Sequence, residues 1–373
     1  MKKIKLIASL LVAFVGLNAT AQNTIKLSTS KTNDYGIVYS LPRTHLDIQI
    51  LAKRTTRKAG PFCQYAKKYL STDDAIMEDR QDIEIEKVVV TPYGVPEDTV
   101  KYLVQFKKSS PVTMVLSEEG LPLGINADVV GYDSRLPEIK VPASTKSAYD
   151  ANVLSGELLR SESTSKRAEI AANRIYEIRE NRNAYNNPDE VDEMPDGQAL
   201  KILMDNMAKD EQSLLALFNG STRTDYFSTT IDYEPNREVK EEVLVRLSDA
   251  TGFVEKEDLS GEPLYITANV IQKGEMPLDV KGNVKELPKN AVVYNIPGEV
   301  QVTLSFSGKN VFSGKYLVAQ QGIQYGLDPN MFTDKKEPCY VTFYPETGAI
   351  RSQGLMNVKD GSEDKTQTET ADE

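Results

Sequence analysis

The spacing of apolar residues changes twice along this chain of 373 residues, and this change constrains the fold more than any other feature. Before and after a central stretch, apolar and polar residues alternate, which is typical of strands with one buried face. From about Ser165 to Phe218 the apolar residues recur every three or four positions, which predicts helices. We therefore predict an α+β, mainly β protein in which a helical hairpin separates two strand-rich parts.

The first strand-rich part, with a short helix after Gly60, is predicted as an N-terminal domain over residues 22–150. Its clearest alternating segment has two faces: Leu46, Ile48 and Ile50 on one, and His45, Asp47 and Gln49 on the other. We expect the apolar face to be core and the polar face to contact water. Further strands are predicted over 83–91, 100–107, 112–116 and 121–125, with a turn at Glu119-Gly120.

The helical hairpin is predicted over residues 151–220. Five residues share one face of its first helix: Ala168, Ala171, Ala172, Ile175 and Ile178. The second helix runs from about Gly197 to Phe218 and carries an apolar stripe: Leu200, Leu203, Met204, Met207, Leu214 and Phe218. We expect this stripe to pack on the neighbouring helix and a sheet, and the alternative is a docking face for another chain.

The second strand-rich part is predicted as a C-terminal domain over 221–358, followed by a disordered acidic tail over 359–373. Its strands are predicted over 226–233, 242–247, 264–271, 291–296, 300–306 and 340–344. Residues 102–125 align without gaps on residues 243–266. The alignment indicates either an internal duplication or two unrelated β-rich domains that share turn chemistry.

The first 21 residues have the pattern of a secretory signal peptide. Lys2, Lys3 and Lys5 precede an apolar run, and Ala19 and Ala21 have the small side chains that signal peptidase recognises. Cleavage after Ala21 would give a periplasmic or secreted protein, and no later stretch is long and apolar enough to predict a membrane helix.

The net charge is −11 for the whole chain and −14 without the three leader lysines. No dense run of Lys and Arg remains after cleavage. Because nucleic acid and anionic lipid are bound through such positive runs, both are poor candidate partners.

The two cysteines, Cys63 and Cys339, would reach an oxidising compartment after export. A disulfide bond between them is one alternative, and it would join the two ends of the fold. Two separate buried thiols are the other alternative, since a bond requires Cα atoms within about 7 Å.

His45 is the single histidine, so one chain cannot assemble a zinc site of the usual His/Cys type. A Ser-His-Asp triad would have to use His45, which shares a strand face with Asp47. The simpler interpretation is that both are polar residues on a solvent-facing strand surface.

The acidic cluster at 189–193 offers oxygen ligands that suit Ca²⁺, but it lacks the alternating pattern of an EF-hand loop, so we expect a solvated loop. No glycine-rich loop opens a helix, as phosphate sites require. Paired carboxylates of a glycosidase would leave no spacing signal among 55 acidic residues. We predict no catalytic residue, no metal ligand and no cofactor.

Four segments combine aromatic residues with proline or glycine: Tyr35–Pro42, Gly60–Leu70, Tyr294–Pro297 and Phe343–Ala349. In these segments the sequence resembles a family of exported Bacteroidetes proteins, the domain of unknown function number 4831. The resemblance covers nearly the whole mature chain and implies a bacterial cell-envelope setting. No activity is established for that family, so the resemblance assigns no functional residue.

We therefore expect an exported cell-envelope protein that is not an enzyme and that binds an envelope protein or ligand, or has a structural role. The alternative is a periplasmic hydrolase that uses carboxylates or a Ser/Lys pair. Buried acids with raised pKa values in a cleft would favour the hydrolase. The sequence carries no signal for the oligomeric state.

Overall fold

The computed structural model describes residues 36–106, 112–129, 137–145, 156–186, 196–288, 290–334 and 336–356. The predicted signal peptide, the predicted tail at 359–373 and the acidic cluster at 189–193 lie outside these residues. The described chain is mainly strands with a pair of long helices, so the predicted mainly β, α+β class is confirmed.

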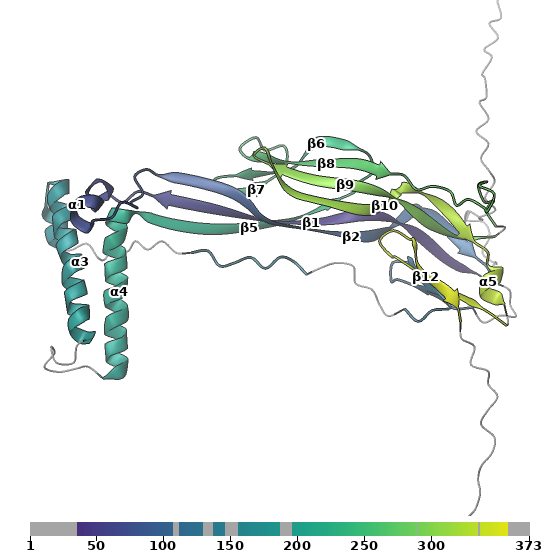
Figure 1. Cartoon of the computed structure of the whole chain (residues 1–373), viewed down its shortest axis with the longest axis horizontal. Coiled ribbons are helices and arrows are strands. Elements are labelled where there is room, and N and C mark those ends of the chain that lie inside the picture. The colour runs from purple at the N-terminus through teal and green to yellow at the C-terminus, as the bar shows by residue number, and fades with distance from the viewer. Residues whose placement is uncertain are drawn as a thin grey trace, which may run out of the picture.

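Antiparallel strands form an elongated body, and the two long helices stand across one end of it (Figure 1). The strands make three sheets, with the orders β2-β1-β5, β10-β9-β8-β6-β7 and β12-β11-β4-β3. The strands are β1 (Ile37–Lys58), β2 (Arg80–Val104), β3 (Met114–Leu116), β4 (Pro122–Ile125), β5 (Ser221–Tyr233), β6 (Val239–Ser248), β7 (Gly252–Val254), β8 (Glu262–Gln272), β9 (Val292–Phe306), β10 (Lys309–Leu327), β11 (Cys339–Phe343) and β12 (Ile350–Leu355). The helices are η1 (Cys63–Tyr65), α1 (Ala66–Leu70), α2 (Gly156–Arg160), α3 (Thr164–Asn186), α4 (Gly197–Asn219) and α5 (Asn330–Thr333).

Strand β1 is central in the three-stranded sheet and pairs with β2 on one side and β5 on the other. The three apolar residues predicted to be core are fully buried: Leu46, Ile48 and Ile50. The prediction for the polar face is wrong at Gln49, which is 3% exposed. Ile139 of the segment 137–145 lies against Gln49 and donates its backbone N–H to Gln49 Oε1 at 2.9 Å.

Two hydrophobic clusters hold the β body together, and each combines strands from both strand-rich parts of the sequence. In the first, the apolar face of β1 packs with buried residues of β6, β8, β9 and β10. In the second, Tyr39 of β1 and Tyr102 of β2 pack with Val293 of β9. The predicted domains at 22–150 and 221–358 therefore share their cores, because β1 and β2 bury their apolar faces against the later strands.

A third cluster belongs to the helical end, where α3 and α4 pack with Phe62 and Ala66. The five residues predicted to share one face of α3 are all buried, and the helical hairpin is confirmed. Helix α4 begins where Asp196 Oδ1 accepts a hydrogen bond from Ala199 N at 2.8 Å, and it ends at Gly220, whose φ is 81°. Glycine fits that position because it adopts a positive φ without steric cost.

Between the body and the helices the molecule narrows to the three-stranded sheet (Figure 1). We call this part the neck: residues 55–58 of β1 and their partners, 80–82 of β2 and 221–224 of β5. None of these residues has an apolar side chain. A cross-strand ion pair takes the place of a core, with Arg57 Nη1 2.5 Å from Asp82 Oδ2.

Strands β2 and β9, like β1 with Pro42, are longer than predicted because they continue through prolines. β2 spans the two predicted strands, and Pro92 and Pro96 fit within it because β2 lies at a sheet edge. β9 continues through Pro297, opposite a bulge in β10 where the register jumps from Val318 to Ile323. Strand β10 itself was not predicted.

The two segments that align in the sequence differ in their pairing. Residues 243–247 of β6 and 264–266 of β8 pair with each other. Residues 102–104 of β2 and 122–125 of β4, which align with them, lie in different sheets. The structure therefore does not repeat one unit, and the likeness reflects shared strand and turn chemistry.

Candidate functional site

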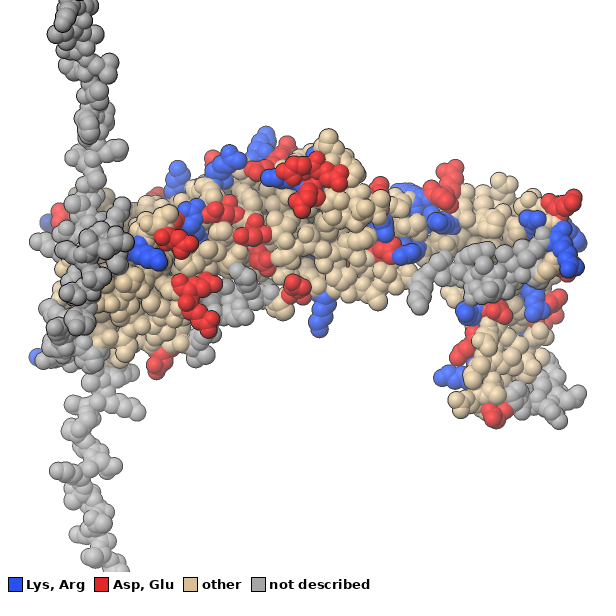
Figure 2. Space-filling view, turned by 180° about the vertical axis from the view of Figure 1, so that it is seen from behind, with Lys and Arg blue, Asp and Glu red and all other residues tan. Residues whose placement is uncertain are grey.

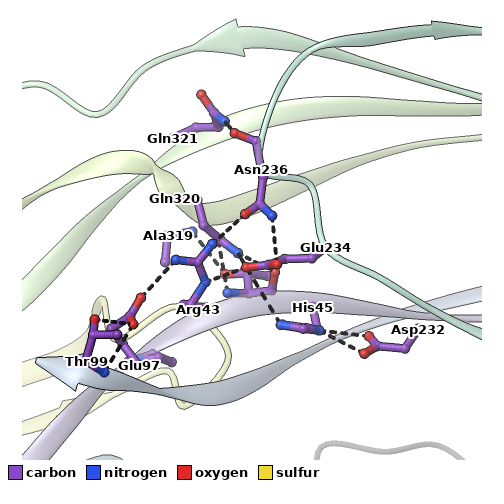
Figure 3. A network of polar contacts seen from close by, with 12 residues as sticks. Arg43, His45, Glu97, Thr99, Asp232, Glu234, Asn236, Ala319, Gln320 and Gln321 are labelled. Carbon is purple, nitrogen blue, oxygen red and sulfur yellow. Dashed lines mark hydrogen bonds and ion pairs between the residues drawn. The ribbon is translucent and has the colours of Figure 1, made fainter. Parts of the chain in front are cut away.

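Arg43 is at the centre of a polar network on the β body, shown in Figure 3. Its Nη1 lies 2.8 Å from Glu97 Oε2 on β2, and its Nε donates to Glu234, which follows β5. Its Nη2 donates to Asn236 Oδ1 at 2.6 Å. One guanidinium thus joins three segments of the chain, because its fork of donors can serve several acceptors at once.

The β10 bulge brings Gln320 to this network. Gln320 Oε1 accepts from Thr44 N at 3.0 Å, and Gln320 Nε2 donates to Thr44 O at 2.9 Å. Thr44 Oγ1 accepts from Ala319 N at 3.0 Å and donates to Glu346 O at 2.8 Å. The bulge lies opposite Pro297, which interrupts the β9 ladder, and it places Gln320 against the β1 backbone at Thr44, beyond the last pair between β1 and β5 at Leu46.

The carboxylates of this network are held in their ionised form. Hydrogen bonds from Arg43 and Thr99 keep the pKa of Glu97 below its ordinary value. Burial raises the pKa of Glu234, but hydrogen bonds from Asn236, Arg43 and Gln320 outweigh it and leave the pKa below its ordinary value. Such acids stabilise a structure and are poor proton donors near neutral pH.

His45 joins the network at its edge, and its surroundings differ from the prediction. Its side chain is 16% exposed, and its Nδ1 lies 2.9 Å from Asp232 Oδ1 on β5. Asp47, the candidate triad partner, instead accepts from Gln49 Nε2 at 2.9 Å. The prediction considered neighbours on one strand, whereas the partner of His45 comes from the paired strand.

The arrangement around His45 is not that of a nucleophilic triad. A triad requires a hydroxyl group beside the imidazole nitrogen that faces away from the aspartate. Here that nitrogen, Nε2, has the Glu234 carboxylate as its neighbour, with Oε1 at 3.9 Å. His45 therefore lies between two carboxylates and fits a structural role in the network.

Asp232, which holds His45, also lines a groove of about 930 Å³ between the edges of β5 and β7. The groove is lined by Thr229, Thr230, Ile231, Asp232, Leu244, Val245, Phe253, Val254, Glu255, Lys256, Glu257 and Asp258. We call this the β5–β7 groove. Ile231, Leu244 and Phe253 are half-buried and pack on the first hydrophobic cluster, so they give the floor an apolar strip within a lining that is otherwise mostly polar.

Contacts at one end fix the shape of the β5–β7 groove. Gly252 at the start of β7 lies against the Phe227 ring of β5. Arg54 of β1 donates to the carbonyl oxygens of Asp249 at 2.7 Å and Ala250 at 2.9 Å, which anchors the β6–β7 turn on the three-stranded sheet. From this closed end, β5 and β7 separate as their residue numbers increase, and the groove lies between them.

The rim of the β5–β7 groove is acidic. Four of its lining residues are acids, Asp232, Glu255, Glu257 and Asp258, and Lys256 is the one base among them. The backbone N–H of Ser260 donates to Asp258 and holds the pKa of that carboxyl below its ordinary value. Figure 2 shows acidic side chains gathered at the upper edge of the body, where β6 and β7 lie in Figure 1.

The two cysteines do not pair. Both thiols are free, and they lie at opposite ends of the molecule (Figure 1): Cys63 in η1 beside the helices and Cys339 at the start of β11. The thiols are separate, as in the second alternative, but they are half-buried and not buried. The elongated shape keeps them apart.

Among the described residues, no group of three or more His, Cys, Asp or Glu side chains could hold a metal ion. In the same part of the chain, no helix is both long and apolar enough to span a bilayer.

Comparison with known proteins gives a family and no activity. A protein-family model described as "Domain of unknown function (DUF4831)" matches residues 35–351. The match runs from the start of β1 into β12, so it includes the β body, the neck and the helical hairpin. No curated protein and no solved structure matches the chain.

Proposed function

We propose that this chain, which belongs to the DUF4831 family, is an exported cell-envelope protein that binds a partner in the β5–β7 groove and does not catalyse a reaction. The observation that carries the proposal is the groove itself: an apolar floor with an acidic rim, built on an ion-paired network. Binding surfaces commonly combine an apolar centre with a polar rim.

The state of the carboxyl groups supports binding over hydrolysis. Each described carboxyl group with a shifted pKa has that pKa lowered: Glu97, Glu169, Asp225, Glu234, Asp258, Asp279 and Asp334. A glycosidase needs one carboxylic acid whose pKa is raised, so that it can donate a proton near neutral pH. Acids held ionised by arginines and amides do not meet that need.

The alternative, a periplasmic hydrolase with a Ser/Lys pair, needs a lysine whose pKa is lowered by burial. Hydrogen bonds to Glu84 and Glu169 instead raise the pKa values of Lys53 and Lys166. Both lysines are therefore held in the ammonium form and cannot act as bases.

Export is supported by the leader sequence, with three lysines, an apolar run and Ala19 and Ala21 before Gln22. N-terminal sequencing of the protein recovered from outside the cytoplasm should begin at Gln22. An intact Met1 on the protein, or recovery from the cytoplasm alone, would contradict export.

Binding is tested by immobilising the mature protein and exposing it to an extract of its host envelope, with mass spectrometry of what is retained. The test variant is the double charge reversal Glu255→Lys and Glu257→Lys at the groove rim, and its matched control lies away from the groove. A second variant, Glu118→Lys with Glu119→Lys in the exposed β3–β4 turn, changes the net charge equally. A partner retained by the wild type and the β3–β4 variant but lost by the groove variant supports the proposal. Equal retention by all three contradicts it.

A further inference from the structure

One side of the β5–β7 groove is an edge strand along its length, and the other is the short edge strand β7 with residues 255–258 that follow it. β5 is the outer strand of the three-stranded sheet and pairs with β1, and β7 is the outer strand of the five-stranded sheet and pairs with β6. An edge strand presents N–H and C=O groups that another strand can bind. Backbone hydrogen bonds reach the outer edge of β5 at Thr224, from Thr145 N at 2.9 Å. Among the described residues, none reaches it along the groove at 229–232.

The groove has the geometry that an inserted strand requires. β5 and β7 leave the contact between Phe227 and Gly252 in the same chain direction and then separate. A strand lying between them would therefore be antiparallel to both, which is the more stable of the two ladder types. The contact at Phe227 closes one end, so the strand would enter from the end near Asp232.

The floor and the rim of the groove suit alternate side chains of such a strand. Successive side chains of a strand point to opposite faces, so one set would face Ile231, Leu244 and Phe253 on the floor. The other set would lie near the rim acids. Asp232 is bound to His45, and Asp258 accepts from Ser260 N at 2.9 Å. Glu255 and Glu257 are exposed, and Lys256 Nζ lies 3.8 Å from Glu257 Oε1. Because that ion pair is exposed and weak, Glu257 as well as Glu255 can accept positive charge from a partner.

The charges decide which kind of segment fits. The groove lining has four acids against Lys256, and the whole chain has a net charge of −11. An acidic segment would be repelled, while Lys or Arg side chains would be attracted and could reach the rim.

We propose that an extended, basic segment of a partner protein, with alternating apolar and Lys or Arg residues, adds as an antiparallel strand to β5 at residues 229–232. The inference rests on the proposed function and names the class of partner for the same groove. Main-chain hydrogen bonds to β5 supply affinity, and the apolar floor and acidic rim select the sequence.

The probe is a short capped peptide of alternating Lys and Val, added to the mature protein. Two control peptides accompany it: one with Glu in place of Lys, and one with Lys-Val sequence whose alternate backbone nitrogens are methylated on the edge that would face β5. Affinity is measured by calorimetry, and backbone amide exchange of residues 229–233 is measured by NMR with and without peptide.

We expect the Lys-Val peptide to bind, and the Glu-Val and N-methylated peptides to bind at least tenfold more weakly. Every second amide in 229–233 should exchange more slowly in the complex, because the other amides already bond to β1.

The Glu255→Lys, Glu257→Lys variant should bind the Lys-Val peptide about tenfold more weakly than the wild type, since each exposed ion pair contributes a severalfold effect. Glu118→Lys with Glu119→Lys should leave the affinity unchanged. Both variants alter exposed side chains, and circular dichroism checks that they fold.

If the N-methylated peptide binds as tightly as the unmethylated Lys-Val peptide, strand addition is wrong. It is also wrong if the peptide slows amide exchange only at residues outside the groove. Self-association of the protein that is lost in the Glu255→Lys, Glu257→Lys variant would also overturn it, because the occupant would then be a second copy. These failures are distinct from failure of the proposed function. A partner retained from the envelope through the groove would support binding even if no basic strand is accepted.

Discussion

The phenol oxygen of Tyr39 makes two hydrogen bonds with the backbone of Val293: it accepts from Val293 N at 2.8 Å and donates to Val293 O at 3.1 Å. The two residues are separated by 254 positions. Tyr39 is 2% exposed, and burial raises its pKa far above the ordinary value, so the phenol stays protonated and can donate. One side chain of β1 thus completes the backbone bonding of β9.

Tyr39→Phe should lower the free energy of unfolding by about 2–3 kcal/mol, because a buried N–H and a buried C=O of Val293 lose their partner. The ring is kept, so packing in the second cluster changes little. Urea denaturation measures the change. The control is Tyr344→Phe, at a side chain that is 40% exposed, where we expect less than about 0.5 kcal/mol. Equal effects would show that the Val293 contacts do not stabilise the fold.

Gly252→Ala should destabilise the protein more than Gly308→Ala. Both glycines have a positive φ, 86° and 71°, so each alanine carries a backbone penalty of about 1 kcal/mol. At Gly252 the new Cβ would also stand 2.7 Å from Phe227 Cδ1, whereas nothing lies within 4 Å at Gly308. We expect a difference of about 1–3 kcal/mol in urea denaturation, because the Phe227 ring must shift. Equal losses would mean that the ring moves freely.

The sequence predicts the two long helices but not the polar network around Arg43, for a physical reason. The five buried residues of α3 lie within one element, so their spacing alone places them on one face. The contacts of the network join residues far apart in sequence: Arg43 and Glu97 differ by 54 positions, and Thr44 and Gln320 by 276. No spacing rule reports a contact that depends on which distant strands pair or on how sheets stack.

Strand β10 was not predicted, although its turn left a signal. Ser307 and Gly308 both have a positive φ and connect β9 to β10 as a two-residue hairpin turn. The alternation after this turn is interrupted by the bulge at 319–322, which carries polar Gln320 and Gln321. An earlier register shift, between Asn310 and Phe312, interrupts the alternation as well, so these two irregularities together remove the strand pattern from the sequence.

The ionised carboxylate of Asp225 should stabilise the folded protein near neutral pH, and acid should remove this stabilisation. Burial raises its pKa, but hydrogen bonds from Arg54 and Arg223 outweigh it and leave the pKa below its ordinary value. A lowered folded-state pKa contributes stability above the unfolded value of about 4, and this stability is lost as the pH falls through the folded value.

Asp225→Asn should therefore lower the free energy of unfolding by about 1–3 kcal/mol at pH 7, and the difference from wild type should narrow below about pH 4. The comparison uses the difference from wild type because the pKa values of Glu97 and Glu234 are also lowered, so acid removes their contributions to stability as well. Urea denaturation at several pH values measures it. A difference that stays constant down to pH 2 would contradict the ion pairs of Asp225.

The helical hairpin should open independently of the β body. Its buried residues form a cluster of their own, and it is joined to the body through the neck, which lacks an apolar core. Glu211 of α4 is 7% exposed and accepts from Arg179 Nε at 2.6 Å and Arg182 Nη1 at 2.7 Å, which clamps α4 to α3.

Glu211→Gln keeps the shape of this side chain and removes its charge, so it should lower the free energy of opening of the hairpin by about 1.5–3 kcal/mol. Amide hydrogen exchange in α3 and α4 should then become at least about tenfold faster, while exchange in β1 and β9 should not change. Glu177→Gln is the matched control, because its ion pair with Arg174 is exposed and should contribute little. Equal acceleration in β1 and β9 would show that the helices and the body unfold as one unit, and that the neck transmits stability between them.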